Sequence, residues 1–346
     1  MAPISATILA PEGLELSPEE RRFFADAQPW GFILFARNIA RPDQLAALTA
    51  SLRDVVGREA PILIDQEGGR VQRMRAPYWR EWRPALEQVV AAGRSSAARS
   101  MWLRARLLAD ELRRVGIDAN CAPLADVARE TTHPILKNRL YGTEPEAVIG
   151  AARAVAEGLL SGGVLPVLKH LPGYGLAEVD SHLDLPRVGA DRATLDGIDF
   201  AAFRPFADLP MGMTAHIVYE AIEQGLPATM SPGLITLIRE EIGFDGLLMT
   251  DDISMNALPG SMAERAVGAR RAGCDIDLHS NGQLSEMEEI VAASGTLDGA
   301  GVERAVRALN ARSAPEPLDI DAAEAELEAL LQGAVYERPA ERQDGA

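Results

Sequence analysis

The chain has 346 residues, of which 47% are hydrophobic and 25% are charged, and its formal net charge is −17. This composition is typical of a globular enzyme with one large or two ordinary domains. The acidic balance argues against nucleic acid as a partner, since that needs a basic face, and no apolar run approaches the roughly 18 residues that can span a bilayer.

Apolar runs alternate with helical patterns along the chain. Seven or eight runs are candidate strands, and those that stand out are, in chain order, GFILFAR (31–37), APILIDQ (60–66), GIDANCAPLADV (116–127), VLPVLKH (164–170), MGMTAHIVY (211–219), GLLMTDDIS (246–254) and CDIDLHSNG (274–282). Because each run is nearly continuously apolar, we expect strands that are buried on both faces of a parallel sheet.

Helices are predicted between these runs. Apolar residues recur at helical spacing from Leu45 to Val55, and a long helix is expected near 95–115. Thr143 and Glu146 have the spacing of a capping box, and Gly162 is expected to end the helix that follows them. Further helix starts are predicted at Ser231 with Pro232 and at Ser261 with Glu264.

Polar residues follow run after run, which decides between an open sheet and a barrel. They are Arg37, Asn38, Asp65, Asp126, Lys169, His170, His216, Asp251, Asp252, His279 and Asn281. Functional groups at the carboxyl ends of many strands are typical of a (β/α)8 barrel of the TIM type. An open doubly wound sheet usually carries a G-x-G-x-x-G loop, and none lies between a strand and a helix here.

We therefore expect one barrel domain over residues 1–313. Residues 314–346 differ in composition and predict one amphipathic helix, Ala323 to Leu331, followed by a polar and disordered end. The start of the chain lacks the pattern of a signal peptide, and Cys121 and Cys274 lie in apolar segments. These features predict a cytoplasmic protein with two buried free thiols.

The stretch KHLPGYGLAEVDSH (169–182) concentrates ionisable residues after a buried strand. Asp180 and His182 are two residues apart, so in an extended loop the carboxylate can approach the imidazole and raise its pKa. The alternative is a loop histidine beside an aspartate that caps a turn. Lys169 ends a buried strand, which is costly unless it meets a ligand or forms a structural ion pair.

Two other strand ends carry acids. Successive residues of a strand point to opposite sides, so one of Asp251 and Asp252 can face the barrel mouth while the other supports neighbouring loops. In DQEGGRVQR (65–73), Asp65 ends a strand, two glycines permit a tight turn, and Arg70 follows. A carboxylate and a guanidinium at a rim suit hydroxyl and amide groups of a ligand.

The residue types leave two chemistries open. One is cleavage of a glycosidic bond by an aspartate nucleophile and a general acid; the other is metal-assisted hydrolysis with His and Asp ligands. Barrels of the second kind usually present a closely spaced H-x-H pair near an early strand, and this sequence has none. We therefore favour glycosidic cleavage with no metal and no cofactor.

Six segments, in this order and spacing, carry a resemblance to a known family: DQEGGRVQR, KHLPGYG, DSH, MTAHIVY, GFDGLLMTDDISM and AGCDIDLHSNG. Over residues 5–310 the chain resembles the single-domain bacterial β-N-acetylglucosaminidases of glycoside hydrolase family 3. The resemblance implies that Asp251 is the nucleophile of a retaining mechanism and that His182, oriented by Asp180, is the general acid/base. The positions that would hold the sugar ring are Asp65, Arg70, Arg139, Lys169 and His170.

The resemblance also implies a partner and a role. The substrate would be a small glycan of peptidoglycan recycling, a disaccharide of N-acetylglucosamine and anhydro-N-acetylmuramic acid or a muropeptide, and the enzyme would be a monomer. One departure is Tyr174, which stands where the family pattern has a second histidine. A family 3 β-glucosidase, a phosphorylase with the same nucleophile and a non-catalytic sugar-binding relative remain the alternatives.

Overall fold

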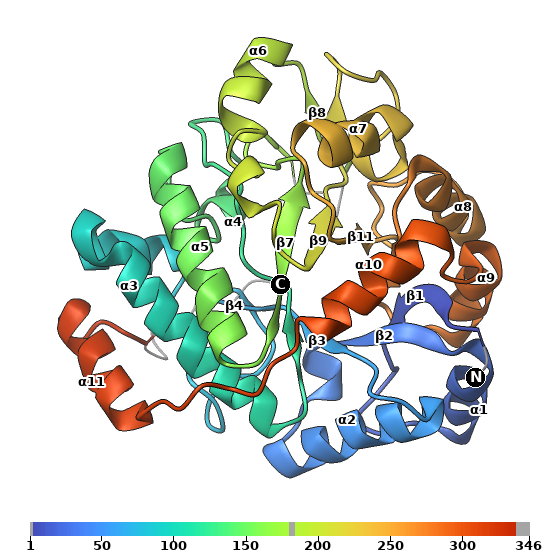
Figure 1. Ribbon diagram of the computed structural model, residues 1–346, viewed down its shortest axis with the longest axis horizontal. Helices are drawn as coiled ribbons and strands as arrows, with labels where there is room; N and C mark the ends of the chain where they lie inside the picture. Colours follow the sequence, from blue (N-terminus) through green and yellow to red (C-terminus); the bar gives the residue numbers. More distant parts are fainter. Residues whose placement is uncertain (1–2, 180–183, 337–346) are drawn as a thin grey trace.

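In the computed structural model, which describes residues 3–179 and 184–336, eight parallel strands close into a barrel (Figure 1). Around the barrel the strands follow the order β1-β12-β11-β9-β7-β6-β3-β2. Their bounds are β1 Ser5–Leu9, β2 Pro29–Leu34, β3 Ile62–Ile64, β6 Ala119–Asn120, β7 Leu165–Leu171, β9 Met211–Thr214, β11 Leu247–Asp252 and β12 Ile276–His279. The predicted (β/α)8 barrel is confirmed.

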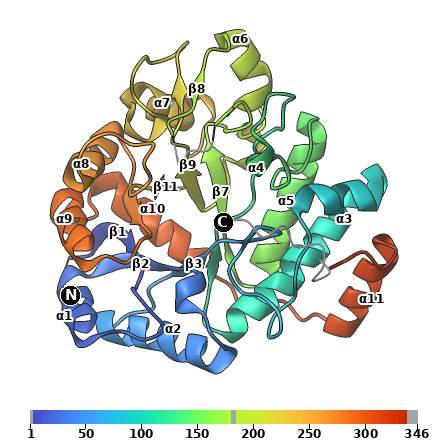
Figure 2. The same cartoon turned by 180° about the vertical axis from the view of Figure 1, so that it is seen from behind.

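Helices surround the barrel on its outside (Figure 2). The longer ones are α1 Pro18–Ala27, α2 Pro42–Val56, α3 Ala85–Arg114, α5 Pro145–Ser161, α8 Met262–Ala272, α9 Leu284–Ser294, α10 Gly299–Asn310 and α11 Ile320–Leu330. Short helices are α4 Pro134–Lys137, α6 Arg192–Thr194 and α7 Pro232–Thr236, and small strand pairs are β4 Gln66–Gly68 with β5 Val71–Gln72 and β8 Arg187–Val188 with β10 Val218–Tyr219.

Two strands differ from the sequence prediction in an instructive way. Strand β1 was not among the predicted runs, although it is fully buried and pairs with both β2 and β12. Strand β6 keeps only two of the twelve residues of its predicted run. Pairing with β7 resumes at Pro123, where the amide of Lys169 donates to the Pro123 carbonyl and the amide of Ala125 donates to the Lys169 carbonyl, both at 3.0 Å, so the run reaches Asp126 as an interrupted strand.

The predicted helix starts and ends are confirmed, including the end of α5 at Gly162, except for the start of α5. Ser261 and Glu264 form the predicted capping box, and the hydroxyl of Ser231 accepts the amide of Leu234 at the start of α7. Helix α5 begins at Pro145 after Glu144, so the predicted capping box at Thr143 is wrong. Proline favours the first helical position because its φ is fixed and it lacks an N–H group, which moves the start past Thr143.

The core has two layers, one inside the barrel and one between the barrel and its helices. The inner layer includes Trp30, Met213, Leu247 and Cys121, while Cys274 belongs to the outer layer. Both thiols are buried and free, as predicted. No helix within the described ranges is long and apolar enough to cross a membrane.

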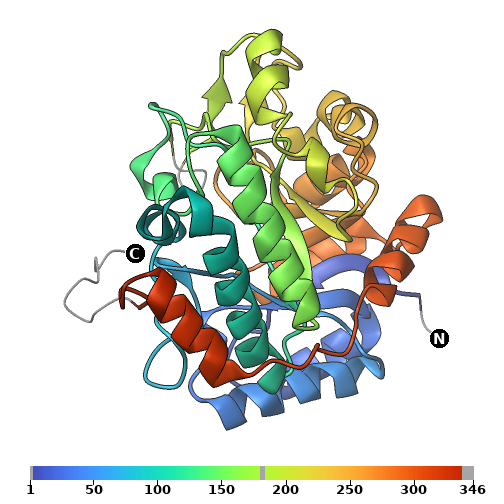
Figure 3. The same ribbon diagram turned by 60° about the vertical axis from the view of Figure 1, so that its left-hand side comes forward.

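Helix α11 lies along α3 on the outside of the barrel (Figure 3). Arg99 of α3 makes a two-pronged contact with Glu326, with both N···O distances 2.7 Å. The ring of Tyr336 packs edge-on against Trp82, with 5.5 Å between centroids. The predicted C-terminal helix is confirmed, beginning slightly earlier because the Asp319 carboxylate caps it. The domain boundary at residue 313 stays a prediction.

Candidate active site

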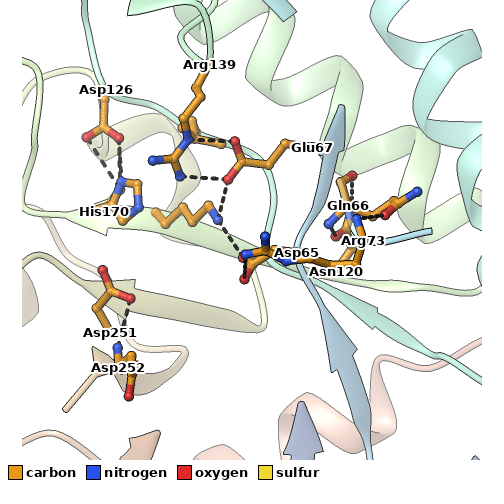
Figure 4. Close-up of polar contacts among 12 residues, drawn as sticks. Asp65, Gln66, Glu67, Arg73, Asn120, Asp126, Arg139, His170, Asp251 and Asp252 are labelled. Carbon is orange, nitrogen blue, oxygen red and sulfur yellow. Dashed lines mark hydrogen bonds and ion pairs between the residues drawn. The ribbon is translucent and has the colours of Figure 1, made fainter. Parts of the chain in front are cut away.

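Three strands place ionisable side chains at one end of the barrel (Figure 4). Asp65 directly follows β3, Lys169 and His170 lie in the last part of β7, and Asp251 and Asp252 end β11. Parallel barrel strands direct their carboxyl ends to the same rim, so residues far apart in sequence meet there.

A charge cluster joins β3, β4, β7 and the loop after α4. The ammonium of Lys169 lies 3.0 Å from Asp65 Oδ1 and 2.6 Å from Glu67 Oε1. The guanidinium of Arg139 grips Glu67 with both prongs, at 2.8 and 2.9 Å. Arg73 adds a contact of 3.3 Å to Asp65 Oδ2. We call Asp65, Glu67, Arg139 and Lys169 the ion-pair cluster.

All members of the ion-pair cluster stay charged near neutral pH. Burial opposes ionisation of Asp65, but Lys169 and Arg73 outweigh it and hold the pKa of Asp65 well below its usual range. Burial likewise opposes ionisation of Glu67, and Arg139 and Lys169 lower its pKa to about 2. The two carboxylates overcome burial at Lys169 and raise its pKa. Lys169 thus takes part in structural ion pairs and also places a positive charge at the rim of the barrel.

His170 is fixed by Asp126, which lies in the loop after β6. The carboxylate of Asp126 lies 2.8 Å from His170 Nδ1 and also accepts the backbone amide of His170 at 3.2 Å. Both side chains are buried. When Nδ1 carries a proton and donates it to Asp126, Nε2 points away from Asp126. This contact therefore fixes the orientation of the imidazole ring.

The side chains of Asp251 and Asp252 make different contacts, as predicted for successive residues of a strand. Asp252 accepts hydrogen bonds from the hydroxyls of Ser254, at 2.7 Å, and Ser280, so its carboxylate ties the end of β11 to the end of β12. The backbone amide of Asp252 donates to Asp251 Oδ1 at 2.8 Å. Burial opposes ionisation of Asp251, but His216, His170, the Asp252 amide and Lys169 lower its pKa. Asp251 is therefore an ionised carboxylate with a fixed orientation.

His216 lies two residues past the end of the neighbouring β9 and supports the end of β11. Its Nε2 lies 2.9 Å from the carbonyl of Asp252 and its Nδ1 lies 2.8 Å from the hydroxyl of Thr229. A carbonyl only accepts, so Nε2 carries a proton, and burial lowers the pKa of the imidazole. His216 thus orients the peptide that follows Asp252.

The remaining residues that the sequence singled out do not belong to the ion-pair cluster. Arg70 lies in the turn between β4 and β5 with an exposed side chain, so its role stays a prediction. Asp180 and His182 lie outside the described residues. Tyr174 is 5% exposed, and its ring centroid lies 5.3 Å from that of His170.

Sequence reasoning missed Glu67, and it named Asp126 and His216 on the rim without giving them roles. Glu67 lies two residues after Asp65 in a strand-like stretch, so the period of two was the signal that both acids could share one side. Nothing local marks Asp126 or His216, because their partners lie at least 13 residues away in the chain. Within the described ranges no group of three or more His, Cys, Asp or Glu side chains could hold a metal ion.

The arrangement suits displacement at a polar, uncharged substrate. An ionised carboxylate with one oxygen fixed by an amide can act as a nucleophile. Buried cations and carboxylates beside it can donate to and accept from several hydroxyl groups at once.

The chain is similar to known proteins over most of its length. The model of the glycosyl hydrolase family 3 N terminal domain matches residues 7–311. A beta-hexosaminidase of Alkalilimnicola ehrlichii is 39% identical over 282 residues, which cover 78% of this chain and 79% of that protein. Native NagZ of Neisseria gonorrhoeae is 30% identical, with a TM-score of 0.83 and coverage of 97% and 99% of the two chains. The same protein in complex with N-trifluoroacetyl-D-glucosamine has a TM-score of 0.81 at 30% identity over 95% of this chain and 97% of that chain.

Proposed function

The chain belongs to glycosyl hydrolase family 3, and from this we propose that it is an exo-acting, retaining β-N-acetylglucosaminidase. The observation that carries the proposal is the position of Asp251: an ionised carboxylate at the end of β11, fixed by the Asp252 amide and facing the same rim as the ion-pair cluster. Relatives named beta-hexosaminidase and NagZ, one of them with a bound glucosamine derivative, support the choice of sugar.

In the first step Asp251 attacks the anomeric carbon and forms a covalent glycosyl-enzyme as the aglycone leaves. His182, oriented by Asp180, donates a proton to the departing oxygen. In the second step His182 removes a proton from water, which attacks the anomeric carbon and restores free Asp251. Two displacements return the sugar in its original β configuration.

The rim would hold the sugar ring through charged groups. Lys169, Arg139 and His170 can donate hydrogen bonds to ring hydroxyls, and Asp65 can accept them. Arg70, exposed in the β4–β5 turn, would approach the ring from the other edge of the site. These assignments follow the family positions, and the burial of Lys169 and His170 supports theirs, because buried charges direct hydrogen bonds strongly.

We place the enzyme in the cytoplasm, as a monomer that releases N-acetylglucosamine from the non-reducing end of peptidoglycan fragments. The natural substrates would be the disaccharide of N-acetylglucosamine and anhydro-N-acetylmuramic acid and the related muropeptides. No metal or cofactor enters the proposed reaction.

The purified protein with nitrophenyl substrates tests the proposal. We expect N-acetyl-β-glucosaminide to be cleaved far faster than β-glucoside, with free N-acetylglucosamine as product in the presence or absence of phosphate. Faster cleavage of the glucoside would instead favour a β-glucosidase, and sugar 1-phosphate as product would favour a phosphorylase. Activity that a chelator abolishes and zinc restores would favour metal-assisted hydrolysis.

A further inference from the structure

Glu67 is a charged residue at the site that the proposed reaction does not use. We propose that Glu67 is a positioning residue, which holds Lys169 and Arg139 in the orientation in which they bind the sugar ring. The inference rests on the proposed function, because the two cations must have a sugar to bind.

The geometry gives Glu67 both cations at once. Its Oε1 lies 2.6 Å from the Lys169 ammonium and 2.8 Å from one Arg139 nitrogen, while Oε2 lies 2.9 Å from another nitrogen of Arg139 (Figure 4). The side chains of Glu67, Lys169 and Arg139 are 4%, 2% and 11% exposed. Water therefore solvates these charged groups only slightly, and each side chain is oriented mainly by its contacts with the other two.

The backbone of Glu67 is itself held in place. The Arg104 guanidinium donates to the carbonyl of Glu67 and, at 2.8 Å, to Gln88 Oε1. One residue earlier, the amide and carbonyl of Gln66 bond to the Asn120 side chain at 3.0 and 3.1 Å, which joins β4 to the end of β6. Glu67 thus acts from a rigid base rather than from a mobile loop.

Asp65 is the other anion that these cations can reach. Its Oδ1 lies 3.0 Å from the Lys169 ammonium, and together with Glu67 it raises the pKa of both Lys169 and Arg139. A buried cation that loses its partner turns to the nearest remaining anion, since an unpaired buried charge is strongly unfavourable. Without Glu67 we expect Lys169 to rest on Asp65 alone and Arg139 to turn from its present direction toward Asp65, which would misplace the contacts of both cations with the sugar.

The test compares Glu67→Gln with a matched control, Glu111→Gln. Glu111 is also buried, 8% exposed, and pairs with Arg80 at 2.9 Å, but it lies in α3 away from the strand ends. Thermal unfolding gives the stability of both variants, and steady-state kinetics with nitrophenyl N-acetyl-β-glucosaminide gives kcat and KM. Analogues that lack single ring hydroxyls show whether a loss depends on sugar contacts.

We expect Glu67→Gln to lower kcat/KM by about 30-fold or more, the scale of one or two charged hydrogen bonds. The loss should shrink for at least one deoxy analogue, and Glu67→Asp should recover part of the activity. Glu111→Gln should keep wild-type kinetics at a comparable loss of stability. If Glu67→Gln does not fold, Glu67→Asp must show the same dependence on the deoxy analogues.

Two results would overturn the inference: wild-type kcat/KM in Glu67→Gln, or an equal loss on every analogue, which would mean a structural role only. A wild-type protein with no activity on the N-acetylglucosaminide would instead contradict the proposed function. The two failures are therefore distinguishable.

Discussion

Asp251 and Asp252 are neighbours in sequence with different environments. The Asp252 carboxylate is used in holding Ser254 and Ser280, whereas Asp251 receives the Asp252 amide on one oxygen. The next peptide, between Asp252 and Ile253, is fixed by His216, whose Nε2 lies 2.9 Å from the Asp252 carbonyl. A nucleophile needs this combination of charge and orientation, because misplacement of reacting atoms is costly in rate.

The proposed division of labour between Asp251 and His182 can be separated by leaving group. Protonation of a sugar leaving group is worth roughly 10² to 10⁴ in rate, whereas nitrophenolate leaves almost unaided. We expect His182→Ala to lose disaccharide cleavage but to give a burst of nitrophenolate followed by a slow steady state. Azide should speed that steady state and yield a β-glycosyl azide, while Asp251→Ala should be inactive with every substrate. Equal loss on both substrates with no burst would remove His182 from the acid/base role.

Position 174 departs from the family pattern, and the structure shows its surroundings. Tyr174 is buried and its ring packs on His170, with 5.3 Å between centroids. Tyr174→His leaves the proposed dyad unchanged, so we expect kcat/KM to change less than about tenfold, or 1.4 kcal/mol in the barrier. Kinetics with the nitrophenyl substrate measures this, and a gain well beyond tenfold would mean that Tyr174 impairs the loop as it stands.

Asp277 is a buried acid of β12 that the proposed reaction does not use. Neither carboxylate oxygen has a hydrogen-bond partner within the described ranges, and burial raises its pKa to about 7, against smaller opposing effects of Ser294 and Arg270. Between the unfolded value of 3.8 and about pH 7 the folded state keeps this proton and the unfolded state does not. The unfolding free energy therefore falls as pH rises through this window.

Asp277→Asn removes that dependence. Relative to wild type, the variant should gain about 2 to 3 kcal/mol in unfolding free energy between pH 5 and pH 8, from linkage at 1.36 kcal/mol per pKa unit. Urea unfolding of both proteins at the two pH values measures the difference, in which the other titrating groups cancel. A difference that does not vary with pH would show that Asp277 titrates normally.

At the scale of elements, the loop after β7 is anchored on the loop after β6. The Thr132 hydroxyl donates to the carbonyl of Gly175, and the amide of His133 donates to the carbonyl of Ala177 at 3.0 Å. Gly175 permits this approach, since a Cβ there would lie 2.0 Å from the carbonyl oxygen of Val127. The anchor precedes Asp180 by only a few residues, so it sets where the segment with the proposed dyad begins.

Gly175→Ala should therefore displace this loop, because the obstructing atom is backbone and cannot rotate away. We expect kcat/KM to fall about tenfold or more and stability to fall by about 1 to 3 kcal/mol, the usual cost of overpacking. Gly150→Ala is the control, since a Cβ at that position in α5 meets nothing within 4 Å. Activity within twofold of wild type in Gly175→Ala would mean that the anchor does not position the catalytic segment.

Elements were predictable where their signals are local. The Ser261 capping box and the continuous apolar run of β7 can each be recognised from a few neighbouring residues, and both are confirmed. Strand β1 was missed because SATIL is short and has no helix pattern before it; only its two neighbours in the closed barrel make it a strand. Closure is a property of the whole sheet, which a local pattern cannot contain.

For the whole molecule, the barrel followed from the positions of the polar residues, but the ion-pair cluster did not. Lys169 and Asp65 are 104 residues apart, and Arg139 and Glu67 are 72 apart. Strand order and register bring them together, and neither can be read from residue types. The sequence therefore indicated which rim carries the chemistry, while the structure supplied the partners.

The central claim is that Asp251 forms a covalent bond with the sugar. The most direct measurement is peptide mass spectrometry after incubation with a fluorinated N-acetylglucosaminyl fluoride, whose glycosyl-enzyme hydrolyses slowly enough to accumulate. We expect one sugar on the peptide that contains Asp251, with fragmentation locating it on that carboxylate, and no adduct in Asp251→Asn. An adduct on another residue, or turnover of this reagent by the wild-type enzyme with no adduct on Asp251, would contradict the account.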